Sequence, residues 1–138
     1  MKKLQWWMRI VGVFYLLLTV MNLYGLFINP DFVRSGLPGT FNSDPLAVRS
    51  FMDAWMVFVF ELGAIGAVLV YASKDPLANK SMVWLIILAE LLRGVLCDAI
   101  WIKNGYDASG YIPFIIIHLI IIITGWIFLK NAEKMAIA

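Results

Sequence analysis

Long apolar stretches separated by shorter polar ones run along the whole chain. A transmembrane helix needs about 20 mostly apolar residues to cross roughly 30 Å of hydrocarbon. Four stretches meet this requirement, over residues 6–28, 53–72, 82–102 and 111–129. The pattern therefore predicts an all-α polytopic membrane protein whose four transmembrane helices form an antiparallel bundle, with residues 1–138 as a single domain.

The polar connections differ in length and composition. Residues 29–52 form the predicted outer loop, which is rich in proline and glycine and longer than most connections in compact domains. Within this loop, Asp44 followed by Pro45 is typical of a helix N-cap and a first helical residue. We therefore expect the second helix to begin before the membrane. The two other connections are short, which makes consecutive helices antiparallel neighbours.

Composition supports the membrane assignment and excludes several classes of function. The chain is 62% hydrophobic and 14% charged, whereas soluble domains are about 45–50% apolar and about 25% charged. Its net charge of +2 is too small to indicate nucleic-acid binding. Cys97 is the single cysteine and cannot form an internal disulfide, so redox chemistry that needs paired cysteines is excluded.

Basic and aromatic residues predict the orientation in the membrane. Lys2 and Lys3 precede an apolar stretch that is too long for a secretory signal and lacks a small-residue cleavage site, so we expect a retained helix. Tryptophan and tyrosine rings gather near the span ends, as in membrane-interface belts. Positively charged residues favour the cytoplasmic side. More of them lie on the side of the two chain ends (Lys2, Lys3, Arg9, Lys74, Lys80, Lys130 and Lys134) than on the other side (Arg34, Arg49 and Lys103). Both termini are therefore predicted to be cytoplasmic.

Charged and titratable residues interrupt the predicted spans near their centres. Glu61, Glu90, Arg93 and His118 each fall within about three residues of a span centre, which is about 5 Å along a helix axis. A charge at this depth costs roughly 2.5–3.5 kcal/mol, so such side chains should turn inward and pair with one another. Their common depth predicts a single site inside the bundle.

One face of the helix predicted over residues 82–102 carries most of these groups. Glu90 and Arg93 stand at positions i and i+3, where a charge pair can form on one helix, either for structure alone or for binding. Removing Arg93 is then expected to be the most damaging single change, because it strands Glu90. Asp98 lies on the same face, and Tyr15 and Asn22 of the first helix add polar groups to the common interior.

A pair of small residues on the second helix predicts a close helix contact. Gly63 and Ala67 form a small-xxx-small step, which lets another backbone approach closely. The step lies on roughly the opposite side of the helix from Glu61. If Glu61 faces the bundle interior, the Gly63/Ala67 face is open to a neighbouring helix or to a second copy of the chain, so a homodimer is one possible assembly.

Short motifs relate the chain to a known group of proteins. They are the opening segment Trp7-Met8-Arg9-Ile10-Val11-Gly12 with Tyr15, and Glu61-Leu62-Gly63 with Gly66. With the four-span layout, these segments resemble the DoxX-like superfamily, particularly its BphX-like branch. The resemblance implies a protein of the bacterial inner membrane with four helices and a poorly defined biochemical role. It supplies no catalytic residues.

The polar interior favours binding of a small amphipathic or lipophilic molecule, with the protein as an independent binder or as an accessory subunit. Apolar walls with a few convergent polar groups are typical of ligand pockets. The candidate ligand-binding or proton-exchanging residues are Glu61, Glu90, Arg93, His118, Asp98, Tyr15 and Asn22. The expected partners are the lipid bilayer and this molecule.

Two other classes of function stay open. In a proton-coupled transporter, Glu61 would alternate between proton and substrate. In an intramembrane enzyme acting on a lipid-soluble substrate, a carboxylate and His118 would serve as general acid and base. The sequence does not assign catalytic residues. One histidine among acids at no recognisable ligand spacing does not indicate a metal site, and we expect no cofactor.

Overall fold

The computed structural model describes residues 1–137, and no strand occurs among them. The helical elements follow in the order α1 (Lys2–Phe27), α2 (Pro30–Arg34), η1 (Gly39–Ser43), α3 (Pro45–Ala72), α4 (Lys80–Ala89), η2 (Glu90–Leu96), α5 (Cys97–Lys103) and α6 (Ala108–Ile137). Of these, η1 is a 3₁₀-helix and η2 is a π-helix, and the others are α-helices.

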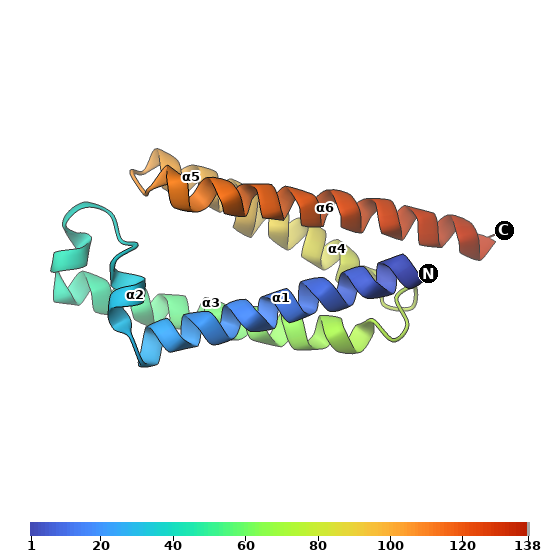
Figure 1. The fold of residues 1–138 in the computed structure, drawn as a ribbon, viewed down its shortest axis with the longest axis horizontal. Coiled ribbons are helices and arrows are strands. Elements are labelled where there is room, and N and C mark those ends of the chain that lie inside the picture. The colour runs from blue at the N-terminus through green and yellow to red at the C-terminus, as the bar shows by residue number, and fades with distance from the viewer. Residues whose placement is uncertain (138) are drawn as a thin grey trace.

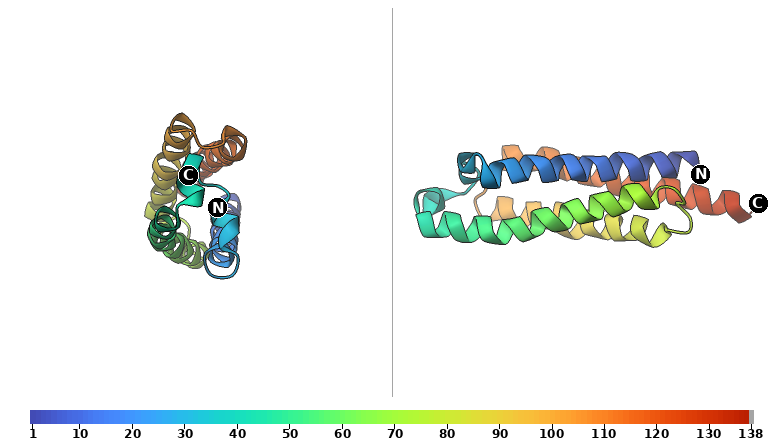
Figure 2. Two further views of the ribbon diagram at one scale, coloured as in Figure 1. Left: turned by 90° about the vertical axis from the view of Figure 1, so that its left-hand side faces the viewer. Right: turned by 90° about the horizontal axis from the view of Figure 1, so that it is seen from below.

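The long helices lie side by side as an elongated bundle (Figures 1 and 2). α3 packs along α1, whereas α4, η2 and α5 follow one another along α6, and α1 also contacts α6. Both chain ends lie at one end of the bundle, and α2 and η1 lie at the other end (Figure 1). The two termini therefore lie on the same side of the bundle, opposite the loop.

Within residues 1–137, three helices are long and apolar enough to cross a membrane: α1, α3 and α6. The sequence predicts a fourth span over residues 82–102, but no single helix of sufficient length occurs there. This stretch consists of the 10 residues of α4, the 7 residues of η2 and the 7 residues of α5, and each is shorter than the roughly 20 residues that a span needs. Hydropathy did not reveal the break, because a π-turn changes the winding of the backbone and not its polarity.

Glycine residues allow α1 and α3 to approach each other at the backbone. A Cβ atom placed on Gly12 would lie 2.9 Å from the carbonyl oxygen of Gly66. A Cβ atom placed on Gly66 would likewise lie 2.9 Å from the carbonyl oxygen of Gly12. Gly63 packs against the side chain of Thr19 in the same way, whereas Ala67 is exposed. The helix that uses the small residues of α3 is thus α1 of the same chain.

The contact between α1 and α6 includes a buried indole ring. The Trp7 indole N–H donates to the Thr124 hydroxyl at 3.1 Å. A Cβ atom added to Gly125 would lie only 2.5 Å from the nearest atom of the same ring. The Thr124 hydroxyl in turn donates to the Ile120 and Ile121 carbonyl oxygens. This polar contact fixes the rotation of α1 on α6 in an otherwise apolar core.

The outer loop contains two short helices and ends at a helix cap. α2 and η1 fill part of the predicted loop over residues 29–52. The Asp44 carboxylate accepts hydrogen bonds from the Leu46 and Ala47 N–H groups at 2.9 and 3.3 Å, and Pro45 is the first residue of α3. The predicted N-cap at Asp44 is confirmed, and α3 begins ahead of the apolar run that starts at residue 53.

Replacing Asp44 with alanine is expected to lower the free energy of unfolding by about 1 kcal/mol, because two N–H groups at the start of α3 lose their acceptor. Unfolding of the purified protein in detergent, followed by circular dichroism, measures the change. Asp53→Ala is the matched control, since Asp53 is an exposed acid on α3 that pairs only with Arg49, at 3.6 Å. Equal losses in the two variants would contradict the capping role.

A second carboxylate marks the start of the last helix. The Ser109 hydroxyl donates to Asp107 at 2.6 Å, and the Ser109 N–H donates to it at 3.0 Å. These two hydrogen bonds lower the pKa of the Asp107 carboxyl group. These hydrogen bonds hold the end of the short connection between α5 and α6 at Asp107. From there α6 runs back along α5.

Candidate functional site

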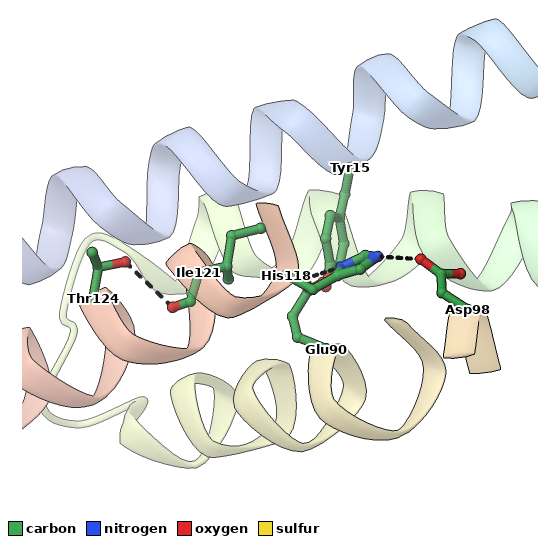
Figure 3. A network of polar contacts seen from close by, with 6 residues as sticks. All are labelled: Tyr15, Glu90, Asp98, His118, Ile121 and Thr124. Atoms are coloured by element: carbon green, nitrogen blue, oxygen red, sulfur yellow. Dashed lines mark hydrogen bonds and ion pairs between the residues drawn. The ribbon is translucent and has the colours of Figure 1, made fainter. Parts of the chain in front are cut away.

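Polar side chains from four different elements meet inside the bundle (Figure 3). The Tyr15 hydroxyl on α1 donates to Oε1 of Glu90 on η2. The other carboxylate oxygen of Glu90, Oε2, lies 2.6 Å from Nδ1 of His118 on α6. Nε2 of the same imidazole ring lies 3.6 Å from Oδ2 of Asp98 on α5. We call Tyr15, Glu90, His118 and Asp98 the polar chain.

The π-helix η2 gives the polar chain its local geometry. Its wider turns begin at Glu90, and Gly94 follows one turn later on the side that faces α6. The His118 ring occupies the space beside Gly94, where an added Cβ atom would lie 2.5 Å from the ring. Only glycine leaves room for the imidazole ring there, so Gly94 permits the contact between His118 and Glu90.

Three members of the polar chain are almost completely removed from the surface, and the fourth, His118, is 17% exposed at its side chain. Tyr15 and Glu90 are each 1% exposed, and Asp98 is 5% exposed. A carboxylate acceptor on Nδ1 places a ring proton at that nitrogen, which orients the imidazole with Nε2 toward Asp98. Asp98 Oδ2 has no hydrogen-bond partner, although it is buried. A buried acceptor without a donor is costly, so Asp98 is the incomplete end of the polar chain.

A small cavity lies where the loop meets the bundle. Its volume is about 150 Å³, which is close to the size that holds one benzene-sized molecule. The lining residues are mainly aromatic or aliphatic: Asn22, Phe32, Val33, Gly36, Leu37, Phe51, Trp55, Trp101, Tyr106 and Tyr111. Because α2 and the loop contribute part of the wall, the segment between α1 and α3 covers part of the cavity at this end of the bundle.

The rings around the cavity contact one another across the helices. The Trp55 and Trp101 ring centroids are 6.0 Å apart, and the Trp101 and Tyr111 centroids are 5.5 Å apart. The Trp55 indole N–H also donates to the Asn22 side-chain oxygen at 2.9 Å. These contacts join α3, which packs mainly on α1, to α5 and α6.

The cavity and the polar chain share the same helix faces. Trp101 follows Asp98 by three residues on α5, and Tyr111 precedes His118 by seven residues on α6. These spacings are about one and two helical turns, or about 4.5 and 10 Å along the axis. Asp98, whose Oδ2 atom lacks a hydrogen bond, therefore lies about one helical turn from the cavity wall at Trp101.

The chain is similar to known proteins over almost its whole length. The model of the BphX-like family matches residues 1–134. An uncharacterized BphX-like protein of Burkholderia cepacia is 30% identical over 133 residues, which cover 91% of this chain and 88% of that protein. An uncharacterized BphX-like protein of Paraburkholderia xenovorans (strain LB400) matches with the same identity and coverage. No solved structure matches.

The chain belongs to the BphX-like family. The names of these two relatives carry no activity, and the chemistry of this BphX-like chain follows from its own residues. Within residues 1–137, no three histidine, cysteine, aspartate or glutamate side chains are grouped so that they could hold a metal ion.

Two predicted site residues of the BphX-like chain lie elsewhere than the sequence suggested. Arg93 does not pair with Glu90; its guanidinium carbon lies 5.4 Å from the Tyr15 ring centroid and 5.0 Å from the Phe58 ring centroid. The prediction assumed α-helical spacing, in which i and i+3 share a face, whereas the wider π-turn moves the two side chains apart around the axis. Arg93 therefore packs on aromatic rings, and Glu90 pairs across the bundle.

Glu61 does not face the interior of the bundle. It is exposed on α3, and its carboxylate forms no hydrogen bond or ion pair with residues 1–137. The prediction of one site rests on the shared depth of Glu61, Glu90 and His118 in their spans. Glu90 and His118 do meet, but depth does not determine the direction in which a side chain points. On α3 the direction was decided by the glycine face that packs on α1, which turns Glu61 away from the polar chain.

From the sequence, the tryptophan residues are expected to serve mostly as a membrane-interface belt and as packing. Trp55, Trp101 and Tyr111 instead line the cavity, together with Tyr106. One signal was available, since Trp101 follows Asp98 by one helical turn and thus shares its face. The contribution of the loop was not readable from any periodic pattern, because a loop has none.

Proposed function

We propose that this BphX-like protein binds a small amphipathic molecule in the cavity between the loop and the bundle. The observation that carries the proposal is Oδ2 of Asp98, which is buried without a hydrogen bond, 3.6 Å from His118 Nε2 and one helical turn along α5 from the cavity wall at Trp101. A buried acceptor of this kind is satisfied by a donor that enters with a ligand. The aromatic wall accepts an apolar body, and Asp98 accepts its donor group.

The membrane placement is part of the same proposal. Besides α1, α3 and α6, we propose that α4, η2 and α5 together cross the membrane as a fourth span, because they follow one another without interruption from Lys80 to Lys103. A π-turn keeps backbone groups hydrogen-bonded within the segment, which a span requires. The excess of basic residues at the end with both termini favours the cytoplasmic face of a bacterial inner membrane. The cavity then opens near the opposite, outer face.

The size and chemistry of the cavity define the ligand class. A volume of about 150 Å³ suits a body of one ring or a short branched chain. A hydroxyl or amino group can supply the donor that Asp98 lacks. We therefore propose a small alcohol, phenol or amine as the ligand, and benzyl alcohol and toluene form a probe pair of similar size that differs in this donor.

Replacing Asp98 with leucine is expected to weaken the binding of benzyl alcohol by about 10-fold or more, because a hydrogen bond to a charged group contributes roughly 1.5–3 kcal/mol. Toluene binding should stay within about threefold, since its contacts are with the rings. Quenching of tryptophan fluorescence in purified protein, at a fixed detergent concentration, measures both affinities.

Asp75→Leu is the matched control for the ligand experiment, because Asp75 is an exposed acid in the connection at the other end of the bundle. It should change neither affinity. Equal weakening of both probes in Asp98→Leu would show a collapsed cavity, and no weakening of either probe would remove Asp98 from the site. Native mass spectrometry before and after delipidation adds a direct observation of any molecule that the protein retains.

One observation favours a second candidate, an acid–base enzyme acting on the bound molecule. His118 Nε2 and Asp98 Oδ2 lie 3.6 Å apart, and Asp98 precedes the cavity-lining Trp101 by one helical turn. Such a pair can exchange a proton with a substrate. His118→Gln should then abolish turnover of a bound substrate while its affinity stays within about threefold. Loss of affinity without any turnover in the native protein would favour simple binding. The position of Glu61 outside the polar chain gives no support to proton-coupled transport through that residue.

The relation to a wider superfamily also remains a proposal. We infer that the BphX-like family is a branch of the DoxX-like superfamily. The inference rests on the short chain with four predicted spans and on the glycine-containing segments around Gly12 and Gly66. In the structure these two glycines form the close contact between α1 and α3. A solved structure of a DoxX-like protein with a different helix pairing would contradict this relation.

A further inference from the structure

The outer face of α3 carries a carboxyl group in the middle of an apolar surface. Glu61 is exposed near the centre of the apolar stretch of this helix. Val57, Ala64 and Val68 are exposed on the same face, at positions i−4, i+3 and i+7 relative to Glu61. Because a membrane-spanning α3 would present this face to hydrocarbon, the carboxyl group needs a polar partner from outside the chain.

The basic residues of the chain do not provide that partner. Within residues 1–137, the exposed lysine and arginine side chains lie near helix ends or in connections (Lys2, Lys3, Arg34, Arg49, Lys74, Lys80, Lys103, Lys130 and Lys134). Arg93 is at the right depth, but its guanidinium group packs on Tyr15 and Phe58 inside the bundle. Another copy of the chain thus presents no exposed cation at the depth of Glu61.

A second Glu61 is nevertheless a suitable partner. Two carboxyl groups that share one site also share a proton, so each side has a donor or an acceptor for the other. Twofold symmetry about an axis along the membrane normal places identical residues opposite each other at the same depth. The small side chain of Ala64, one turn away, allows two α3 helices to approach closely at this point.

We propose that Glu61 faces the Glu61 of a second copy of the chain, and that Val57, Ala64 and Val68 of both α3 helices pack around the pair. This interface differs from the Gly63/Ala67 face suggested by the sequence, because Gly63 packs on Thr19 within the chain. It also uses no residue of the polar chain or the cavity. The proposal therefore stands or falls independently of ligand binding.

The decisive comparison is between two replacements of Glu61. Glu61→Gln keeps a side chain that both donates and accepts, so the dimer dissociation constant should stay within about threefold of the native value. Glu61→Leu removes the hydrogen bonds, and the dissociation constant should rise at least 10-fold. Sedimentation equilibrium in a density-matched mild detergent measures all three proteins, and circular dichroism verifies that each is folded.

Cross-linking tests the geometry of the same interface. In a Cys97→Ser background, Ala64→Cys should form a disulfide-linked dimer on mild oxidation, whereas Ile123→Cys, exposed on α6, should not. A native protein that stays monomeric would overturn the proposal, as would a dimer that Glu61→Leu leaves intact. Equal loss of the dimer in Glu61→Gln and Glu61→Leu would also overturn the proposal. That result would mean that the dimer needs the ionised carboxylate and not a hydrogen bond between the two side chains.

Discussion

Glu90→Leu is expected to lower the free energy of unfolding by about 2–6 kcal/mol. Leucine removes the acceptor of the Tyr15 hydroxyl and of His118 Nδ1, which lies 2.6 Å from the carboxylate. Both groups remain in the bundle interior, and each buried polar group without a partner costs about 1–3 kcal/mol. Unfolding in a titration of sodium dodecyl sulfate against a mild detergent, followed by tryptophan fluorescence, measures the loss.

Two further variants show whether the effect of Glu90→Leu comes from the polar chain. Glu90→Gln keeps an acceptor for Tyr15 and should lose less than half as much stability as Glu90→Leu. Arg93→Leu should also be milder, because Arg93 packs on the Tyr15 and Phe58 rings and leucine preserves part of that packing. This reverses the ranking predicted from the sequence, in which Arg93 was the partner of Glu90. An Arg93→Leu variant less stable than Glu90→Leu would restore that ranking.

Gly94→Ala is expected to lower the free energy of unfolding by about 1–3 kcal/mol, the range found for overpacked interiors. The added methyl group would lie 2.5 Å from the His118 ring. The ring has little room to retreat, because Glu90 holds its Nδ1 on one side and Asp98 faces its Nε2 on the other. Thermal unfolding in detergent measures the stability.

Gly110→Ala is the matched control for Gly94→Ala. Gly110 is also helical, near the start of α6, but no heavy atom lies within 4 Å of its added Cβ atom. Alanine favours a helix over glycine by up to about 1 kcal/mol, so this variant should be as stable as the native protein or slightly more stable. If Gly94→Ala matched Gly110→Ala, the close contact between η2 and His118 would be disproved.

The π-helix connects the local backbone to the site. π-turns inside helical segments occur frequently at functional sites, because they turn side chains in directions that a regular α-helix does not allow. In this chain η2 begins at Glu90, and the segment then continues as α5, which carries Asp98. The same turn separates Glu90 from Arg93 and brings Glu90 to Tyr15 and His118. The irregular winding thus produces the arrangement that the proposed function uses.

The apolar runs determined the helical fold of this protein without any tertiary information. Residues 6–28, 53–72 and 111–129 lie within α1, α3 and α6 or reach one residue past an end, since a run of about 20 apolar residues has few alternatives to a helix. Local chemistry also fixed the start of α3, where Asp44 caps the N–H groups of Leu46 and Ala47. Family membership was readable as well, from short segments such as Glu61-Leu62-Gly63.

Tertiary structure alone decided which side chains meet. Glu61, Glu90 and His118 share a depth in the sequence pattern, but only the packing of α1 on the glycine face of α3 turns Glu61 outward. The pairing of Glu90 with Tyr15 and His118 depends on a π-turn and on the space beside Gly94. Hydropathy gives the depth of a residue in a span, and helical spacing gives its angle around one ideal helix. Contacts across a bundle depend instead on how each helix is rotated against its neighbours.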